Sequence, residues 1–136
     1  MDRVVPSPRT VVSIGIDVAD VARVARFLSD HPARLEHVFT ARERAFCEAG
    51  SGRRRGARYA AAFSAKEAVM KALGTGWRSD LDWSEIDTAS RRADGGVLLS
   101  GGAREIAERH GVARILISVA TTAETTMAMA VADRHE

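Results

Sequence analysis

The sequence predicts an α+β fold in which an antiparallel sheet packs against one long helix and several short helices. An apolar run near the N-terminus has the composition of a strand and passes directly into a segment of helical periodicity. A long segment with an apolar face fills the middle of the chain, and short β-rich runs separated by turn residues follow it. At 136 residues the chain has room for one core, so we expect a single domain over residues 1–136.

The first elements can be predicted in order along the chain. Residues 1–10 hold two of the three prolines, so we expect a loose lead-in there. The mostly apolar run over residues 11–16 is typical of a buried strand, and Asp17 stands at its exit. In residues 19–30 the apolar positions recur at i, i+3 and i+7, which predicts an amphipathic helix with a basic outer face.

The long helix is predicted after a capping signal and a loop. Thr40 and Glu43 have the spacing of a capping box, which predicts the start of a second, short helix. The Gly- and Arg-rich residues 50–57 are expected to form a loop. The main helix should then run from Arg58 to Leu73.

The second half of the chain is predicted to be mostly strand. Turn residues at 93–96 indicate a hairpin, and Gly111 marks the end of a short helix. The expected elements are strands over 81–90 and 97–99, a helix over 103–110, and a closing hairpin of strands over 112–120 and 127–132.

Composition excludes several classes of protein. The chain is 46% hydrophobic and lacks both an apolar run of about 20 residues and a signal-peptide pattern, so we expect no membrane partner. Cys47 is the only cysteine, which excludes an intrachain disulfide and fits a reducing, cytoplasmic location. Four arginines cluster at 53–58, where they form either a solvated loop or a site for phosphates or an acidic partner. With 5% aromatic residues and no recognised binding motif, we expect no nucleic-acid partner.

The segment KEAVMKALGTG, residues 66–76, is the strongest candidate for a functional site. Glu67 and Lys71 stand four apart and share one helical face, where they form either a surface ion pair or part of a site. In a site, the carboxylate would hold a divalent cation and the ammonium would meet a phosphate. Lys66 and the backbone N–H groups of Gly74, Thr75 and Gly76 would neutralise the rest of a phosphate chain.

Asp17 is the second acid of this candidate site. Its position at the end of a strand suits a side chain that projects into a cleft, and equally suits the N-cap of the next helix, a role that Asp20 could also take. Together, Asp17 and Glu67 would supply two hard oxygen ligands for Mg²⁺. Such a pair beside lysines is what transfer of a phosphorylated group requires.

Three motifs occur in a fixed order along the chain. They are GID at 15–17 with Arg23 six residues after the Asp, FTxxE at 39–43, and FxxKEAxxKALGTG at 63–76. In this order they resemble the motifs of the holo-acyl-carrier-protein synthases, which are 4′-phosphopantetheinyl transferases. Weaker similarity continues through 95–111 and the closing hairpin, so the resemblance covers nearly the whole chain.

The resemblance implies the 4′-phosphopantetheinyl transferase fold and a reaction. Coenzyme A would donate its phosphopantetheine arm to a serine of an apo acyl carrier protein, leaving 3′,5′-adenosine diphosphate. Asp17 and Glu67 match the Mg²⁺ ligands, and Lys71 matches the lysine that protonates or neutralises the departing phosphate. Either Glu67 or a metal-ordered water would take the serine proton. Arg23, assisted by Arg26, would meet acidic residues of the carrier, and family members of this size form homotrimers with active sites between neighbours.

Two positions depart from the family pattern. Ala62 stands where the pattern RFAxKEA has an arginine, and Thr121 stands where the hairpin pattern SxSH has a histidine. Both changes remove possible phosphate contacts, for which Arg58 or the arginines at 53–55 would compensate. The alternative to an enzyme is a non-catalytic relative that binds carrier protein or coenzyme A without turnover. Whether the carrier serves fatty-acid or polyketide synthesis is left open.

Overall fold

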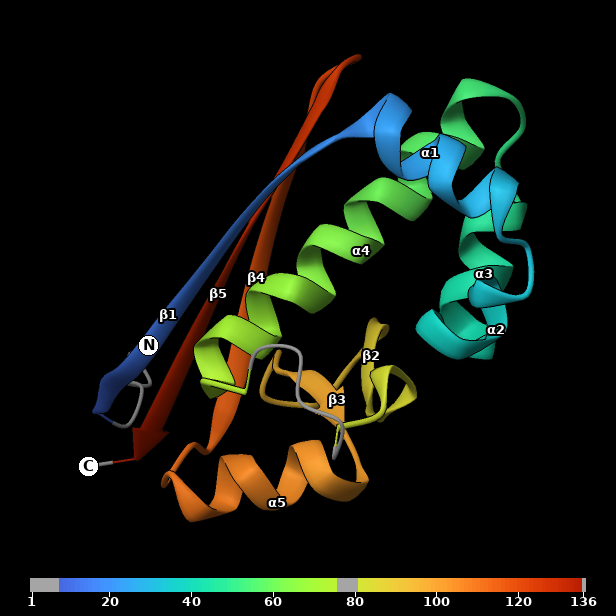
Figure 1. Cartoon of the computed structure of the whole chain (residues 1–136). Coiled ribbons are helices and arrows are strands. Elements are labelled where there is room, and N and C mark those ends of the chain that lie inside the picture. Colours follow the sequence, from blue (N-terminus) through green and yellow to red (C-terminus); the bar gives the residue numbers. More distant parts are fainter. Residues whose placement is uncertain (1–7, 76–80, 136) are drawn as a thin grey trace, which may run out of the picture.

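The computed structural model describes residues 8–75 and 81–135 and has the expected α+β fold (Figure 1). Its helices are α1 (Val21–Asp30), α2 (Arg34–Val38), α3 (Ala41–Glu48), α4 (Arg53–Leu73) and α5 (Gly101–Arg109), with a 3-10 turn at Trp83–Glu85. Its strands are β1 (Arg9–Asp20), β2 (Ile86–Arg91), β3 (Val97–Leu99), β4 (Arg114–Thr121) and β5 (Thr125–His135). None of the helices within these ranges is both long and apolar enough to cross a membrane.

The strands form two antiparallel sheets rather than the single sheet that we expected. The larger sheet has the order β1-β5-β4, so that β1 and β4 are its edges, and β2 and β3 pair separately. Helix α4 runs along the larger sheet (Figure 1). Helices α1 and α3 pack against α4, and α2 contacts the 3-10 turn. The sequence signals for β2 and β3 were correct, but pairing between distant strands leaves no local pattern by which to assign them to one sheet or two.

Strand β1 is longer and more exposed than the sequence indicated. It begins at Arg9, inside the expected lead-in, of which residues 1–7 lie outside the described part of the chain. It ends at Asp20, so Asp17 lies within the strand and not at its exit. The expected burial holds for one face only, because Ile14, Ile16 and Val18 are exposed. Backbone pairing with β5 carries the strand past its apolar run.

Small residues allow β1 and β5 to lie close to α4. Ala128, Ala130 and Ala132 alternate along β5 and are fully buried. Where β1 crosses the helix, a Cβ placed on Gly15 would lie 2.0 Å from the carbonyl oxygen of Ala68, far inside any real contact. The backbone of β1 therefore rests directly on the backbone of α4, two residues before Asp17.

Helix α4 begins at Arg53 and not at Arg58, so the expected loop over 50–57 is wrong in its second half. Gly52 has a φ of 56° and is the N-cap residue, so the helix starts directly after it. The arginines that follow have good helix propensity. The helix ends as predicted at Leu73, with Gly74 in the left-handed conformation.

The short helices largely follow their capping signals. Asp20 caps α1 by accepting a hydrogen bond from the Arg23 backbone N–H at 2.8 Å, so this role falls to Asp20 and not to Asp17. The capping box of Thr40 and Glu43 at the start of α3 is confirmed. Helix α2 has five residues and too short an apolar period to be predicted.

The second half matches the prediction apart from its boundaries. Residues 81–85 are not a strand, because the Asp82 side chain caps the 3-10 turn that precedes β2. The hairpin of β2 and β3, helix α5 and the closing hairpin of β4 and β5 are confirmed.

Candidate active site

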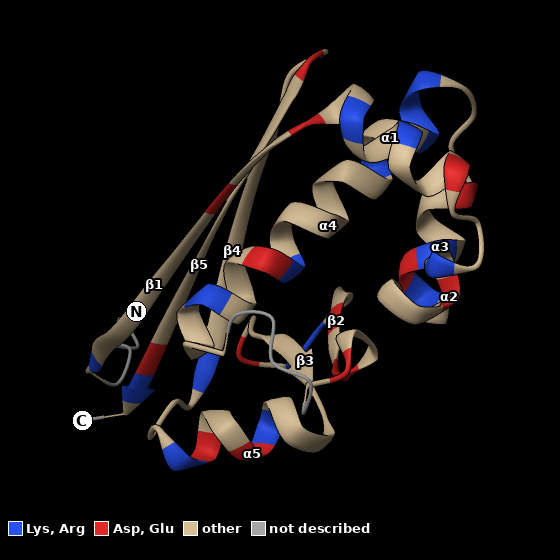
Figure 2. Ribbon diagram, viewed as in Figure 1, with Lys and Arg blue, Asp and Glu red and all other residues tan. Residues whose placement is uncertain are grey.

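The structure brings together the residues that two distant motifs supplied. Asp17 comes from the edge strand β1, and Glu67 and Lys71 come from the C-terminal half of α4. Figure 2 shows acidic segments on both elements and basic segments on α4. The Asp17 Oδ1 atom lies 3.2 Å from the Lys71 ammonium, which also donates to the Ile16 carbonyl oxygen at 2.9 Å. The Ser64 hydroxyl donates to Asp17 Oδ2 at 2.8 Å. The partner of Lys71 is therefore Asp17, and not Glu67 one turn away.

Glu67 has an electrostatic environment that suits a cation ligand. Its side chain is half-buried, and burial raises the pKa of its carboxyl group. The nearby charge of Asp17 raises this pKa further, while Lys71 opposes the shift. Within the described part of the chain, no hydrogen-bond donor reaches the Glu67 carboxylate.

The two acids fit a Mg²⁺ ion. Two neighbouring carboxylates repel each other, and a divalent cation between them would remove that repulsion. Asp17 and Glu67 are hard oxygen donors, and no third His, Cys, Asp or Glu joins them to complete a protein-only metal site among the described residues. Mg²⁺ typically accepts such a set, because it keeps waters and substrate phosphate in the remaining positions.

A pocket of about 500 Å³ opens beside these two acids. It lies between β1, α1, α2 and α4, and Arg23 is also part of its lining. Its apolar wall includes the rings of Phe63 and Trp83, which stack with centroids 5.4 Å apart. The pocket therefore has a basic side chain of α1 and the two carboxylates in one lining. Arg26 is exposed on the same helix and is not part of this lining.

Lys66 does not belong to this site, which corrects the expectation that it would neutralise a phosphate. Its side chain has no exposed surface and forms a buried ion pair with Glu43, with 2.7 Å between Nζ and Oε1. It also donates to the carbonyl oxygen of Ile86. Burial lowers the pKa of the Lys66 ammonium, and the Glu43 charge opposes that shift. Lys66 therefore fastens α4 to α3 and β2.

The glycine loop after α4 also differs from the expectation. The backbone N–H groups of Gly74 and Thr75 are not free, because they donate to the carbonyl oxygens of Lys71 and Met70 in the helix cap. The Thr75 side chain is buried, and its hydroxyl donates to Met70 as well. Gly76 lies outside the described residues. Neither Gly74 nor Thr75 thus has a backbone donor to offer an anion.

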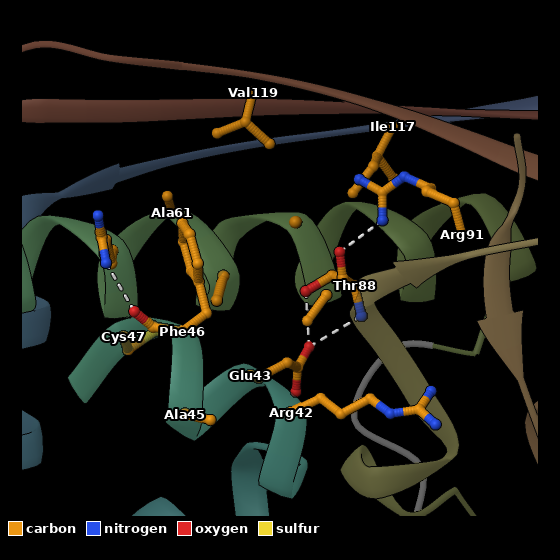
Figure 3. A pocket seen from close by; sticks show the side chains of 14 residues that line it. Arg42, Glu43, Ala45, Phe46, Cys47, Ala61, Thr88, Arg91, Ile117 and Val119 are labelled. Atoms are coloured by element: carbon orange, nitrogen blue, oxygen red, sulfur yellow. Dashed lines mark hydrogen bonds between the residues drawn. The ribbon is translucent and has the colours of Figure 1, made fainter. Parts of the chain in front are cut away.

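A second pocket, of about 710 Å³, was not predicted from the sequence (Figure 3). It lies between α3, α4, β2 and β4, and Arg42, Arg58 and Arg91 stand around it. The Arg58 guanidinium lies 4.3 Å from the centroid of the Phe46 ring and donates to the Phe46 carbonyl oxygen at 2.7 Å. Ala62 lines the same pocket, so Arg58 stands near the position where the family arginine is missing.

Cys47 does not have the properties of a catalytic nucleophile. Cys47 is buried, and burial together with the Glu43 charge raises the pKa of its thiol to about 12, so the thiolate needed of a nucleophile does not form near neutral pH. The four histidines are exposed, and His37 is part of the lining of the pocket beside Asp17 and Glu67.

Comparison with known proteins identifies the family of the chain. A family model described as the 4′-phosphopantetheinyl transferase superfamily matches residues 13–131. A holo-[acyl-carrier-protein] synthase of Solibacter usitatus is 38% identical over 120 residues, which cover 87% of this chain and 94% of that protein. One from Moorella thermoacetica is 41% identical over 112 residues, which cover 80% and 84%.

Solved structures agree with the sequence matches. The holo-[acyl-carrier-protein] synthase of Neisseria meningitidis has a TM-score of 0.73 at 26% identity, covering 90% of this chain and 98% of that one. The Bacillus anthracis synthase, in complex with CoA (3′,5′-ADP), has a TM-score of 0.71 at 25% identity, covering 91% and 97%. The chain therefore belongs to the 4′-phosphopantetheinyl transferase superfamily. Within it, the chain is an enzyme of the holo-[acyl-carrier-protein] synthase type.

Proposed function

We propose that this enzyme catalyses the Mg²⁺-dependent transfer of 4′-phosphopantetheine from coenzyme A to a serine of an apo acyl carrier protein, with release of 3′,5′-ADP. The observation that carries the proposal is that Asp17 and Glu67, from segments about fifty residues apart in sequence, line one pocket, while the Lys71 ammonium pairs with Asp17. Two acids and one ammonium provide a cation site and a group to meet negative charge.

The bond changes assign a role to each residue. The serine oxygen forms a bond to the phosphorus that carries the pantetheine arm, and the bond from that phosphorus to the bridging oxygen breaks. The bridging oxygen leaves on the 5′-phosphate of 3′,5′-ADP, where the Lys71 ammonium neutralises or protonates it. The serine proton passes to Glu67 or to an ordered water. When bound by Asp17 and Glu67, Mg²⁺ supplies charge neutralisation for the pyrophosphate.

The arginine-lined pocket is our candidate for the nucleotide portion of coenzyme A. The Bacillus anthracis relative was crystallised with CoA (3′,5′-ADP), which supports coenzyme A as the donor here. Arg42, Arg58 and Arg91 would meet phosphates, and the apolar wall between them would take the adenine ring. Arg58 would thereby compensate for the arginine that is absent at Ala62.

A homotrimer would complete this site. Asp17 lies on the edge strand β1, whereas the arginine-lined pocket lies beside the opposite edge strand β4, with β5 between them. One chain therefore does not place the nucleotide pocket against its own carboxylates. The outward face of β1 and β5 is apolar and exposed at Ile16, Val18 and Met129, which suits burial against a neighbouring chain. A monomeric mass by light scattering would contradict this proposal.

The partner and location follow from the same assignment. The acceptor is an apo acyl carrier protein of fatty-acid or polyketide synthesis, and the location that we propose is the cytoplasm. A buried, free Cys47 is compatible with a reducing compartment.

The direct test mixes the purified enzyme, coenzyme A, Mg²⁺ and an apo carrier, and follows the carrier by intact-mass spectrometry. We expect the carrier to gain one phosphopantetheine arm, 3′,5′-ADP to appear in equal amount, and both to disappear when EDTA removes the metal. A protein that binds coenzyme A or the carrier and transfers nothing would instead be a non-catalytic relative.

Arg23→Glu should weaken the encounter with the carrier more than the binding of coenzyme A. Arg23 is exposed on α1 and lines the pocket that holds Asp17 and Glu67, so its charge faces an incoming acidic partner. We expect the carrier KM to rise roughly tenfold at low salt, and the defect to shrink at high salt, where wild-type activity also falls. Arg109→Glu, an exposed reversal on α5, serves as the control. An equal loss of coenzyme A affinity by calorimetry would argue against a carrier-binding role for Arg23.

A further inference from the structure

The Asp17 carboxylate is held by a hydroxyl group as well as by an ammonium group. Ser64 is fully buried on α4, and its hydroxyl donates to Asp17 Oδ2 at 2.8 Å. The Lys71 ammonium holds the other oxygen, Oδ1, at 3.2 Å. Each carboxylate oxygen has two lone pairs, so both retain one for a cation.

The contacts of Asp17 with Lys71 and with Ser64 differ in how they would change during the reaction. The Lys71 side chain is 50% exposed, and in the proposed reaction its ammonium turns to the departing phosphate. The contact between Lys71 and Asp17 would then be weakened at the stage at which the Asp17 carboxylate has to hold the metal ion. The Ser64 hydroxyl is enclosed between α4 and β1 and has no such second task.

Ser64 also lies three residues before Glu67 on the same helix. The α4 backbone therefore carries Glu67 directly and holds the Asp17 carboxylate through the Ser64 hydroxyl. A metal site needs its ligands fixed relative to one another, and hydrogen bonds to the ligands usually provide this.

We propose that Ser64 is a positioning residue, which fixes the Asp17 carboxylate relative to Glu67 for Mg²⁺ binding while Lys71 is engaged with phosphate. The inference rests on the proposed function. The family pattern RFAxKEA has alanine at this position, so the hydroxyl is a feature of this chain and not of the pattern as such.

The test compares Ser64→Ala with Ser13→Ala. Ser13 also joins β1 to α4, by donating to the Ala72 carbonyl oxygen, but its hydroxyl bond does not involve Asp17. Mn²⁺ binding is measured by electron paramagnetic resonance with coenzyme A bound, and the Mg²⁺ concentration for half-maximal activity is measured in parallel. Loss of a ligand-orienting hydrogen bond typically weakens metal binding about 10–100-fold. We expect Ser64→Ala to raise both constants about tenfold, with kcat at saturating Mg²⁺ changed less than about twofold, and Ser13→Ala to leave both constants unchanged.

The outcomes separate the two proposals. Equal Mn²⁺ affinity in wild type and Ser64→Ala, or an equal loss in Ser13→Ala, overturns the role of Ser64 and leaves the proposed function intact. A wild-type enzyme that transfers the arm without binding Mn²⁺ or needing Mg²⁺ overturns the metal site and the role of Ser64 together. If Ser64→Ala melts at a much lower temperature, Ser64→Cys carries the same test, because a thiol fills the space and is only a weak donor.

Discussion

Asp17→Ala and Glu67→Ala should each lower the rate of phosphopantetheine transfer by about 10² or more while the protein stays folded. Each variant removes one of two carboxylates, and stabilisation of transition-state charge by a metal is worth several kcal/mol, with tenfold in rate for each 1.4 kcal/mol. Stability should change little for Glu67→Ala, since its half-buried carboxylate accepts no hydrogen bond within the described residues. The rate is measured with coenzyme A and Mg²⁺ in excess.

Glu105→Ala is the matched control for this pair, because Glu105 is an exposed carboxylate on α5, away from both pockets. Melting temperatures of all three variants separate loss of chemistry from loss of fold. If either site variant melted like wild type and kept near wild-type turnover, the assignment of the metal ligands would be wrong.

Lys71→Met should lower the single-turnover rate by about 10²–10³ and change coenzyme A affinity much less. The ammonium lies 3.2 Å from Asp17 on a side chain that is half exposed, from which we expect it to turn to a bound phosphate. A contact that strengthens as charge grows on the leaving oxygen raises turnover, whereas a contact of constant strength only tightens binding. Removing a mere surface ion pair would cost only about 0.2–1 kcal/mol of stability.

The measurement for Lys71→Met is a single-turnover rate at saturating coenzyme A and Mg²⁺, with donor affinity from calorimetry. Lys71→Arg is the companion variant, because it keeps the positive charge but replaces the compact ammonium with a planar guanidinium that does not give up a proton near neutral pH. A Lys71→Met rate within about threefold of wild type would falsify the catalytic role, since that is far less than the loss expected for such a group.

The sequence identified Asp17, Glu67 and Lys71 as candidate site residues because they lie in two motifs that contain charged side chains suited to metal and phosphate binding. It could not predict that Lys71 pairs with Asp17, because the pairing depends on where β1 crosses α4. That crossing is set by the close approach at Gly15, which no local pattern records. Asp17 lies inside β1, whereas the prediction based on the apolar run placed the end of the strand before Asp17.

Lys66 shows why one residue of a motif can belong to the core and its neighbour to the site. Adjacent positions on a helix point about 100° apart, so Lys66 and Glu67 face different neighbours. The partner of Lys66 is Glu43, which the sequence identified only as part of a capping box. The arginine-lined pocket was missed for a related reason, because its arginines come from three separate elements.

The burial of Lys66 gives the two lysines of this sequence opposite chemical accessibility. Acylation of an amine needs the neutral group in contact with the reagent, and Lys66 is enclosed by α3, α4 and β2. Of the two lysine side chains, the folded chain therefore offers only that of Lys71 to a lysine-selective reagent. A covalent label or an inhibitor with a lysine-reactive group would therefore be directed to the proposed active site by the fold itself.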